Sequence, residues 1–192
     1  MLFAHDTETA LLAAVELVNS LVAPDTLANT EELRSFYDRH GYTGRFDAHE
    51  AALQAVRALR GELRELLTAN RDSAAKQVNA ILAEAKALPR LVRHDELDWH
   101  IHAVDERAPF HRRLAVETAM AMVDLIRADE LSRLSLCADE GCDGLVFDLT
   151  RNRARRFCST RCANRHAAAA YRARSRAQRA IHDRPAPAAG QL

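Results

Sequence analysis

The chain has 192 residues with 27 basic and 27 acidic side chains, and alanine (37 residues) far outnumbers the ten aromatic residues. This composition favours helices over sheets. The sequence contains no run of 18 apolar residues, the length that would span a membrane. Its acidic N-terminus lacks the basic region of a secretory signal, so we expect a cytoplasmic protein.

The zero net charge hides a separation of charge along the chain. Residues 1–150 carry 16 basic and 26 acidic side chains, whereas residues 151–192 carry 11 arginines and a single acid, Asp183. The net charges of the two parts are therefore −10 and +10. Such asymmetry predicts two parts with different partners, of which the basic part attracts a polyanion.

Apolar residues at helical spacing predict five helices in the first 134 residues, over about 9–22, 30–40, 48–70, 73–88 and 111–129. Candidate N-caps are Asn29, Asp47 and either Asp72 or Ser73. Between the fourth and fifth helices, residues 89–105 alternate between apolar and polar side chains, which predicts a small β-hairpin. Residues 1–134 are thus expected to form one helical domain with a β insert.

Few residues of this domain point to a ligand. Asn19 is a polar residue on an apolar helix, and Trp99, His100 and His102 lie in the predicted hairpin, with the two histidines on one face. One interpretation is a small-molecule effector or metal site, although two histidines need a third ligand to form a complete metal site. The simpler interpretation is a half-exposed strand whose Trp99 packs on the helices.

The four cysteines lie within 26 residues, in the pattern C-x4-C-x15-C-x3-C formed by Cys137, Cys142, Cys158 and Cys162. Two close pairs at this separation predict a tetrahedral Zn²⁺ site, closed and therefore structural. An iron–sulfur cluster, disulfides or free thiols are alternatives, and His166 could replace one thiolate.

The cysteine module, residues 135–182, is expected to fold as a β-hairpin followed by a helix, as in treble-clef or ribbon-like zinc modules. Residues 145–149 alternate as one strand, and residues 155–157 can return as the second. Ser159 is a candidate N-cap, which puts Cys158 just before the helix and Cys162 in its first turn. The Pro/Ala-rich residues 183–192 are expected to be a disordered tail.

On that helix, five arginines fall within an arc of about 60° at 100° per residue, and Arg174 lies on the far side. The five are Arg161, Arg165, Arg172, Arg176 and Arg179. Arg155 and Arg156 add charge on the predicted hairpin, and Asn164 lies beside the stripe. Such a line of guanidinium groups matches a phosphate backbone, and DNA is the favoured partner.

Two other partners stay open. The basic helix could dock on the acidic N-terminal domain or on another protein, or it could bind RNA, with Tyr171 and Phe157 as the nearest aromatic residues. No nucleophile elbow, phosphate loop or HExxH motif occurs, so we expect no enzyme. DNA-binding proteins often pair on two-fold sites, which makes a homodimer an expectation.

The segment Phe157-Cys-Ser-Thr-Arg-Cys-Ala-Asn-Arg165, with Cys137, Cys142 and Tyr171-Arg-Ala-Arg174, resembles the CGNR zinc finger of bacterial transcription regulators. Ala163 and Phe157 stand where that family has Gly and Trp. Upstream, Leu17-Val-Asn-Ser20, the helix around 57–67 and Pro89-Arg-Leu-Val92 with Asp98-Trp-His100 resemble its N-terminal ABATE-type domain. The resemblance implies a stress-linked regulator with a DNA-binding finger and a sensor or assembly domain.

Overall fold

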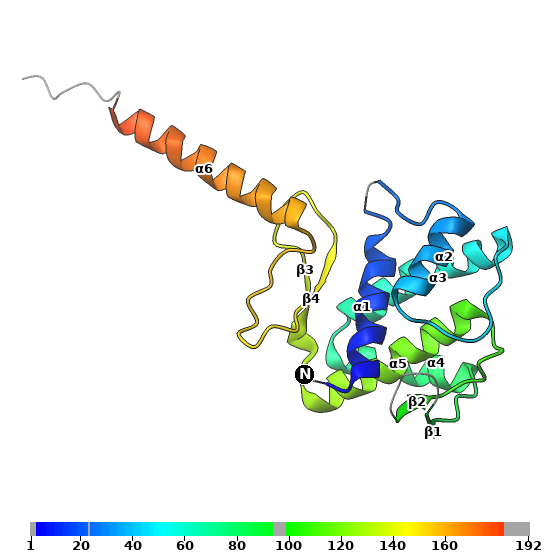
Figure 1. Cartoon of the computed structure of the whole chain (residues 1–192). Helices are drawn as coiled ribbons and strands as arrows, with labels where there is room; N and C mark the ends of the chain where they lie inside the picture. The colour runs from blue at the N-terminus through cyan, green and yellow to red at the C-terminus, as the bar shows by residue number, and fades with distance from the viewer. Residues whose placement is uncertain (1–2, 23, 94–98, 183–192) are drawn as a thin grey trace, which may run out of the picture.

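A computed structural model describes residues 3–22, 24–93 and 99–182, with side chains up to residue 178. It confirms a mainly helical chain with two small hairpins (Figure 1). The helices are α1 (His5–Asn19), α2 (Thr30–Arg39), α3 (Glu50–Thr68), α4 (Arg71–Glu84), α5 (Phe110–Ala128) and α6 (Thr160–His182). The strands are β1 (Arg90–Val92), β2 (His100–His102), β3 (Leu134–Leu136) and β4 (Leu145–Phe147), with a 3₁₀ turn at Leu131–Arg133. The predicted tail, 183–192, and the side chain of Arg179 lie outside the described residues.

The core of the N-terminal part forms where α1 to α5 meet. The apolar stripes that predicted these helices face inward, and Leu11, Leu63, Leu114, Met122 and Leu125 are almost fully buried. These side chains come from α1, α3 and α5, so the middle of the bundle is filled by aliphatic side chains. None of the described helices has the length and apolarity needed to cross a membrane.

Of the three N-caps predicted in the N-terminal part, one is correct. The side chain of Asn29 accepts a hydrogen bond from the backbone N–H of Glu32, as expected. α3 is capped by His49 instead of Asp47, whose carboxylate pairs with Arg45. α4 is capped by Asn70, so its first turn begins one residue before Asp72 and two before Ser73.

The predicted hairpin in the N-terminal part is confirmed, but the packing expected of its tryptophan is wrong. β1 and β2 pair antiparallel with Leu91 opposite Ile101. Trp99 is 64% exposed and therefore does not pack into the helical core.

The hairpin of the cysteine module differs from the prediction. β4 pairs with β3, a strand the sequence did not indicate, while residues 155–157 form no strand. The reason lies in Asp148, whose carboxylate accepts the backbone N–H groups of Thr150 and Arg155. A side chain thus holds the returning segment where ladder hydrogen bonds were expected. From this module α6 extends away from the helical bundle (Figure 1).

Candidate metal centre and basic helix

The four cysteines converge from two sites in the chain, as their spacing predicted. Cys137 follows β3, and Cys142 precedes β4 in the turn of that hairpin, where the Cys137 N–H donates to Gly144 O at 2.8 Å. Cys158 and Cys162 flank the start of α6, and the Ser159 hydroxyl accepts the Cys162 N–H, which confirms the predicted N-cap. All four Sγ atoms lie within 4.8 Å of one another.

The sulfur spacing suits a single metal ion. The Sγ atoms of Cys142 and Cys158 are 3.6 Å apart, and those of Cys158 and Cys162 are 3.7 Å apart. A tetrahedron with metal–sulfur bonds of about 2.3 Å has edges of about 3.8 Å. A disulfide bond needs about 2.05 Å, and an iron–sulfur cluster places several iron atoms between its thiolates and needs wider spacing. The His166 ring lies tilted against the Phe157 ring, with centroids 5.1 Å apart, and is not part of the cluster.

The thiols influence one another electrostatically. Burial raises the pKa of the Cys158 thiol, and the neighbouring sulfurs raise it further. Burial also opposes ionisation of Cys137, but hydrogen bonds involving backbone groups of Cys158 and Asp139 outweigh it and lower that pKa. One thiolate is therefore favoured while further negative charge is resisted. A divalent cation between the sulfurs removes this resistance.

Gly144 is a site residue that sequence reasoning missed. A Cβ atom at this position would lie 2.8 Å from the Sγ of Cys158 and 3.2 Å from that of Cys142. Its backbone N–H also points to the Sγ of Cys142 at 3.4 Å. The backbone therefore passes so close to these two sulfurs at position 144 that only glycine fits. A glycine two residues after the second cysteine was the available signal.

Arg165, which is expected to bind nucleic acid, also has a contact within the chain. Its Nε donates to Oδ2 of Asp139 at 2.6 Å, and its terminal nitrogen contacts the same oxygen and, at 3.5 Å, the Sγ of Cys162. The Arg165 hydrogen bond lowers the pKa of Asp139. This pair ties the Cys137–Cys142 turn to α6. Asp139 was not predicted, because its partner is 26 residues away.

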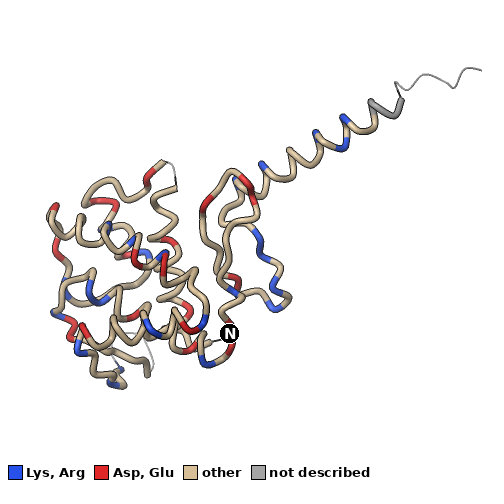
Figure 2. Tube along the Cα trace, turned by 180° about the vertical axis from the view of Figure 1, so that it is seen from behind, with Lys and Arg blue, Asp and Glu red and all other residues tan. Residues whose placement is uncertain are grey.

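The other described arginines of the stripe are exposed. Arg161, Asn164, Arg172 and Arg176 all face solvent on α6. Figure 2 shows basic residues along the projecting helix, and the described part of α6 contains no Asp or Glu. No ion pair of Arg172 or Arg176 is found among the described side chains. The open alternative, in which α6 docks along the acidic face of the same chain, is not the arrangement seen for the described residues (Figure 1).

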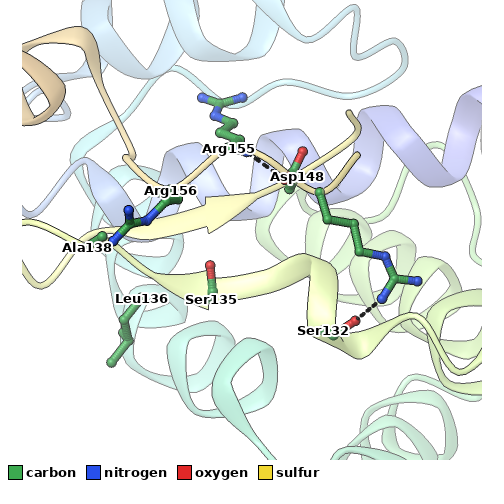
Figure 3. A pocket seen from close by; sticks show the side chains of 8 residues that line it. Ser132, Ser135, Leu136, Ala138, Asp148, Arg155 and Arg156 are labelled. Carbon is green, nitrogen blue, oxygen red and sulfur yellow. Dashed lines mark hydrogen bonds between the residues drawn. The ribbon is translucent and has the colours of Figure 1, made fainter. Parts of the chain in front are cut away.

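Arg155 and Arg156 line a shallow cavity of about 250 Å³ on the hairpin side of the module (Figure 3). Both side chains are exposed. In the cavity wall, Arg153 donates to the Ser132 hydroxyl at 2.8 Å and to Glu130 at 2.7 Å. The cavity therefore combines one neutralised arginine with two exposed ones.

Asn19, a candidate ligand residue, has a contact within the chain that the sequence did not predict. Its Nδ2 donates to the Leu145 carbonyl at 2.8 Å, and its Oδ1 accepts the Leu145 N–H at 2.6 Å. We call these two bonds the Asn19 clamp. They join the end of α1 to β4, three residues after Cys142.

The three candidate ligand residues of the N-terminal domain do not form one site. The backbone N–H of Ile101, between His100 and His102, donates to Asp6 in the first turn of α1. Trp99 and His100 therefore lie near one end of α1, and Asn19 lies at the other, about 20 Å away at 1.5 Å per residue.

Comparison with known families agrees with these two parts. A model described as "ABATE: Putative stress-induced transcription regulator" matches residues 12–129. A model of the CGNR zinc finger matches residues 133–175. Neither describes an enzyme. No curated protein matches the chain.

Proposed function

The chain belongs to the ABATE family of transcription regulators and carries a CGNR zinc finger, and from this we propose that it binds DNA through α6 when Zn²⁺ is bound. The observation that carries the proposal is the exposed arginine face of a helix that projects from the four-cysteine module. We also propose that the protein acts in the cytoplasm, the compartment that holds its DNA target.

In this proposal, Cys137, Cys142, Cys158 and Cys162 hold the ion as four thiolates. A closed four-thiolate site has no open position for substrate, so the ion supplies folding energy rather than catalysis. Structural Zn²⁺ contributes about 10–16 kcal/mol in zinc-finger peptides. That energy fixes the start of α6 against the β3–β4 hairpin, and the pair of Arg165 and Asp139 reinforces the same junction.

The exposed arginines would divide the DNA contacts by position. Arg161 and Asn164 lie next to the metal centre, where the helix is held most firmly, and we assign them to groove or positioning contacts. Arg172 and Arg176, one helical turn apart, are assigned to phosphates. Arg161 and Arg176 are about 22 Å apart along the helix, which suits a run of phosphates. Arg155 and Arg156 on the adjacent cavity would add phosphate contacts, as would Arg179.

The test compares arginines on opposite sides of α6. Selection from a random duplex pool provides the probe, and fluorescence anisotropy measures affinity between 50 and 200 mM salt. Arg172→Ala with Arg176→Ala should weaken binding and reduce the salt slope by about 2, because each phosphate contact contributes about 0.9. Arg174→Ala, an exposed arginine on the far side, is the matched control and should change the affinity less. An unchanged slope in the double variant would contradict the proposal.

RNA is the second candidate, favoured by Tyr171, which is 66% exposed beside Arg172. An exposed ring can stack on an unpaired base. If single-stranded RNA outcompetes the duplex, and Tyr171→Ala removes that advantage, the RNA assignment replaces DNA. If the arginine face binds another protein, this chain should bind neither duplex DNA nor single-stranded RNA.

For the N-terminal domain we propose a sensor or assembly role. Pairing of two copies would match a two-fold DNA site. Light scattering of the full chain tests this: a monomer with and without duplex would exclude the paired arrangement.

A further inference from the structure

Strand β2 places two imidazole rings side by side in the N-terminal domain, far from the cysteines in the chain. The Nε2 atoms of His100 and His102 are 3.1 Å apart, and the ring centroids are 4.8 Å apart. Both residues are half-buried. Alternate residues of a strand share one face, so this pairing follows directly from the His-x-His pattern.

We propose that His100 and His102 bind a divalent transition-metal ion of the class that prefers imidazole, with Zn²⁺, Ni²⁺ and Cu²⁺ as members. Two imidazole nitrogens bound to one ion at about 2.0–2.1 Å, at angles between square and tetrahedral, lie about 2.9–3.4 Å apart. The observed 3.1 Å falls within that range. A metal site at these histidines was one interpretation of the sequence, and the spacing of the two rings now supports it.

The surrounding structure holds the two rings in this arrangement. Each histidine is opposite a residue of β1 in the antiparallel pair, His100 opposite Val92 and His102 opposite Arg90. The residue between them, Ile101, donates its backbone N–H to Asp6 at 3.2 Å. The register and this bond hold the backbone of β2 on both sides, so the two side chains start from fixed positions on one face of the strand.

If these two histidines are the protein ligands among the described residues, the remaining positions of the ion are open to exchangeable ligands such as water. Such a site exchanges its ion, in contrast to the closed four-thiolate centre. The competing explanation is a hydrogen bond between two neutral rings, one donating and the other accepting, which requires no metal. Metal stoichiometry distinguishes the two.

The experiment uses the full chain with the cysteine centre first saturated with Zn²⁺, and equilibrium dialysis then measures further Zn²⁺ uptake. We expect a second equivalent in the parent protein and its loss, at least a tenfold weaker affinity, in His100→Ala with His102→Ala. His166→Ala, a histidine on α6, is the matched control and should retain the second equivalent. Cu²⁺ bound to the Zn²⁺-loaded protein should show nitrogen hyperfine coupling in its electron paramagnetic resonance spectrum.

Uptake of a single equivalent by the parent protein would overturn the proposal, and so would a second equivalent that persists in the double variant. Circular dichroism checks that the double variant is folded. Should it unfold, the single variant His102→Gln takes its place, and the same two outcomes decide the question.

Discussion

The Asn19 clamp connects the helical bundle to the metal-centre hairpin, and Asn19→Ala removes it without touching a cysteine. The side-chain amide uses its donor and its acceptor on the same backbone residue, at 2.8 Å and 2.6 Å. It therefore bonds the outer edge of β4 much as another strand would. We expect this substitution to destabilise the protein. We also expect metal removal from the cysteine module to affect the stability of the helical bundle less than it does in the parent protein.

The expected magnitude follows from the two hydrogen bonds. Each intramolecular bond contributes about 0.5–1.5 kcal/mol net, so the loss of both costs about 2 kcal/mol. For a chain of this length each kcal/mol shifts Tm by about 2–4 °C, which gives a decrease of about 4–8 °C. Asn19→Asp should cost more, because a carboxylate oxygen would then face the Leu145 carbonyl oxygen.

The assay is thermal unfolding followed by circular dichroism, with and without a chelator. In the parent protein, metal removal should lower the stability of the helical bundle as well as the cysteine module, because the clamp links them. In Asn19→Ala, the chelator should affect the bundle less. Asn29→Ala is the matched control: it loses one exposed capping bond, costs about 1 kcal/mol, and should leave the chelator effect intact.

Equal Tm decreases in the two variants, together with an unchanged chelator effect, would show that the clamp does not connect the two parts. The reasoning would also fail if Asn19→Ala lowered Tm by less than 1 °C. In that case water would replace both bonds at no cost.

Two further substitutions test the metal centre and the bundle. Gly144→Ala should weaken metal binding at least tenfold in a competition assay with a chelator, because its Cβ would lie 2.8 Å from the Sγ of Cys158, whereas Gly141→Ala meets no atom within 4 Å and should have no effect. Burial raises the pKa of Glu117 from an ordinary 4.5 to about 7. Between these two pH values the unfolded chain loses the Glu117 proton while the folded chain keeps it, so the free energy of unfolding should fall by about 3 kcal/mol as pH rises. Glu117→Gln should remove this fall in the free energy of unfolding, measured by urea unfolding at pH 5 and 8, whereas the exposed Glu65→Gln should retain it. Parallel pH curves for Glu117→Gln and the parent would show that Glu117 does not cause the fall.

Local sequence patterns predicted most of the fold, because local interactions determine it. The apolar periodicity of α1 to α5 and the Ser159 cap act within one or two turns of helix, so their signals are complete in a short window. The convergence of the cysteines also followed from spacing, since a metal-binding pattern reports a contact across the chain.

The errors concern side chains whose partners are distant or compete locally. Asp148 holds the segment after β4 with its carboxylate, which no strand pattern reveals. The contact of Arg165 with Asp139 was not predicted, and neither was that of Asn19 with Leu145, which is 126 residues away. Amide and guanidinium groups serve structure and binding equally well, so only their three-dimensional neighbours separate the two roles.

The arginine stripe therefore divides into an inner and an outer part, and distance from the acidic bundle explains why the outer part suits a polyanion. Arg165 is neutralised by Asp139, whereas Arg172 lies about 18 Å along α6 from its first residue. At physiological salt the field of a charge decays over about 8 Å, so the net −10 of residues 1–150 is largely screened there. The projecting helix thus carries Arg172 and Arg176 away from the acidic residues, whereas Arg165 and Arg153 nearer the bundle form ion pairs with Asp139 and Glu130. In the proposed function, the energy of the metal centre fixes the base of α6 and keeps the outer arginines available to DNA.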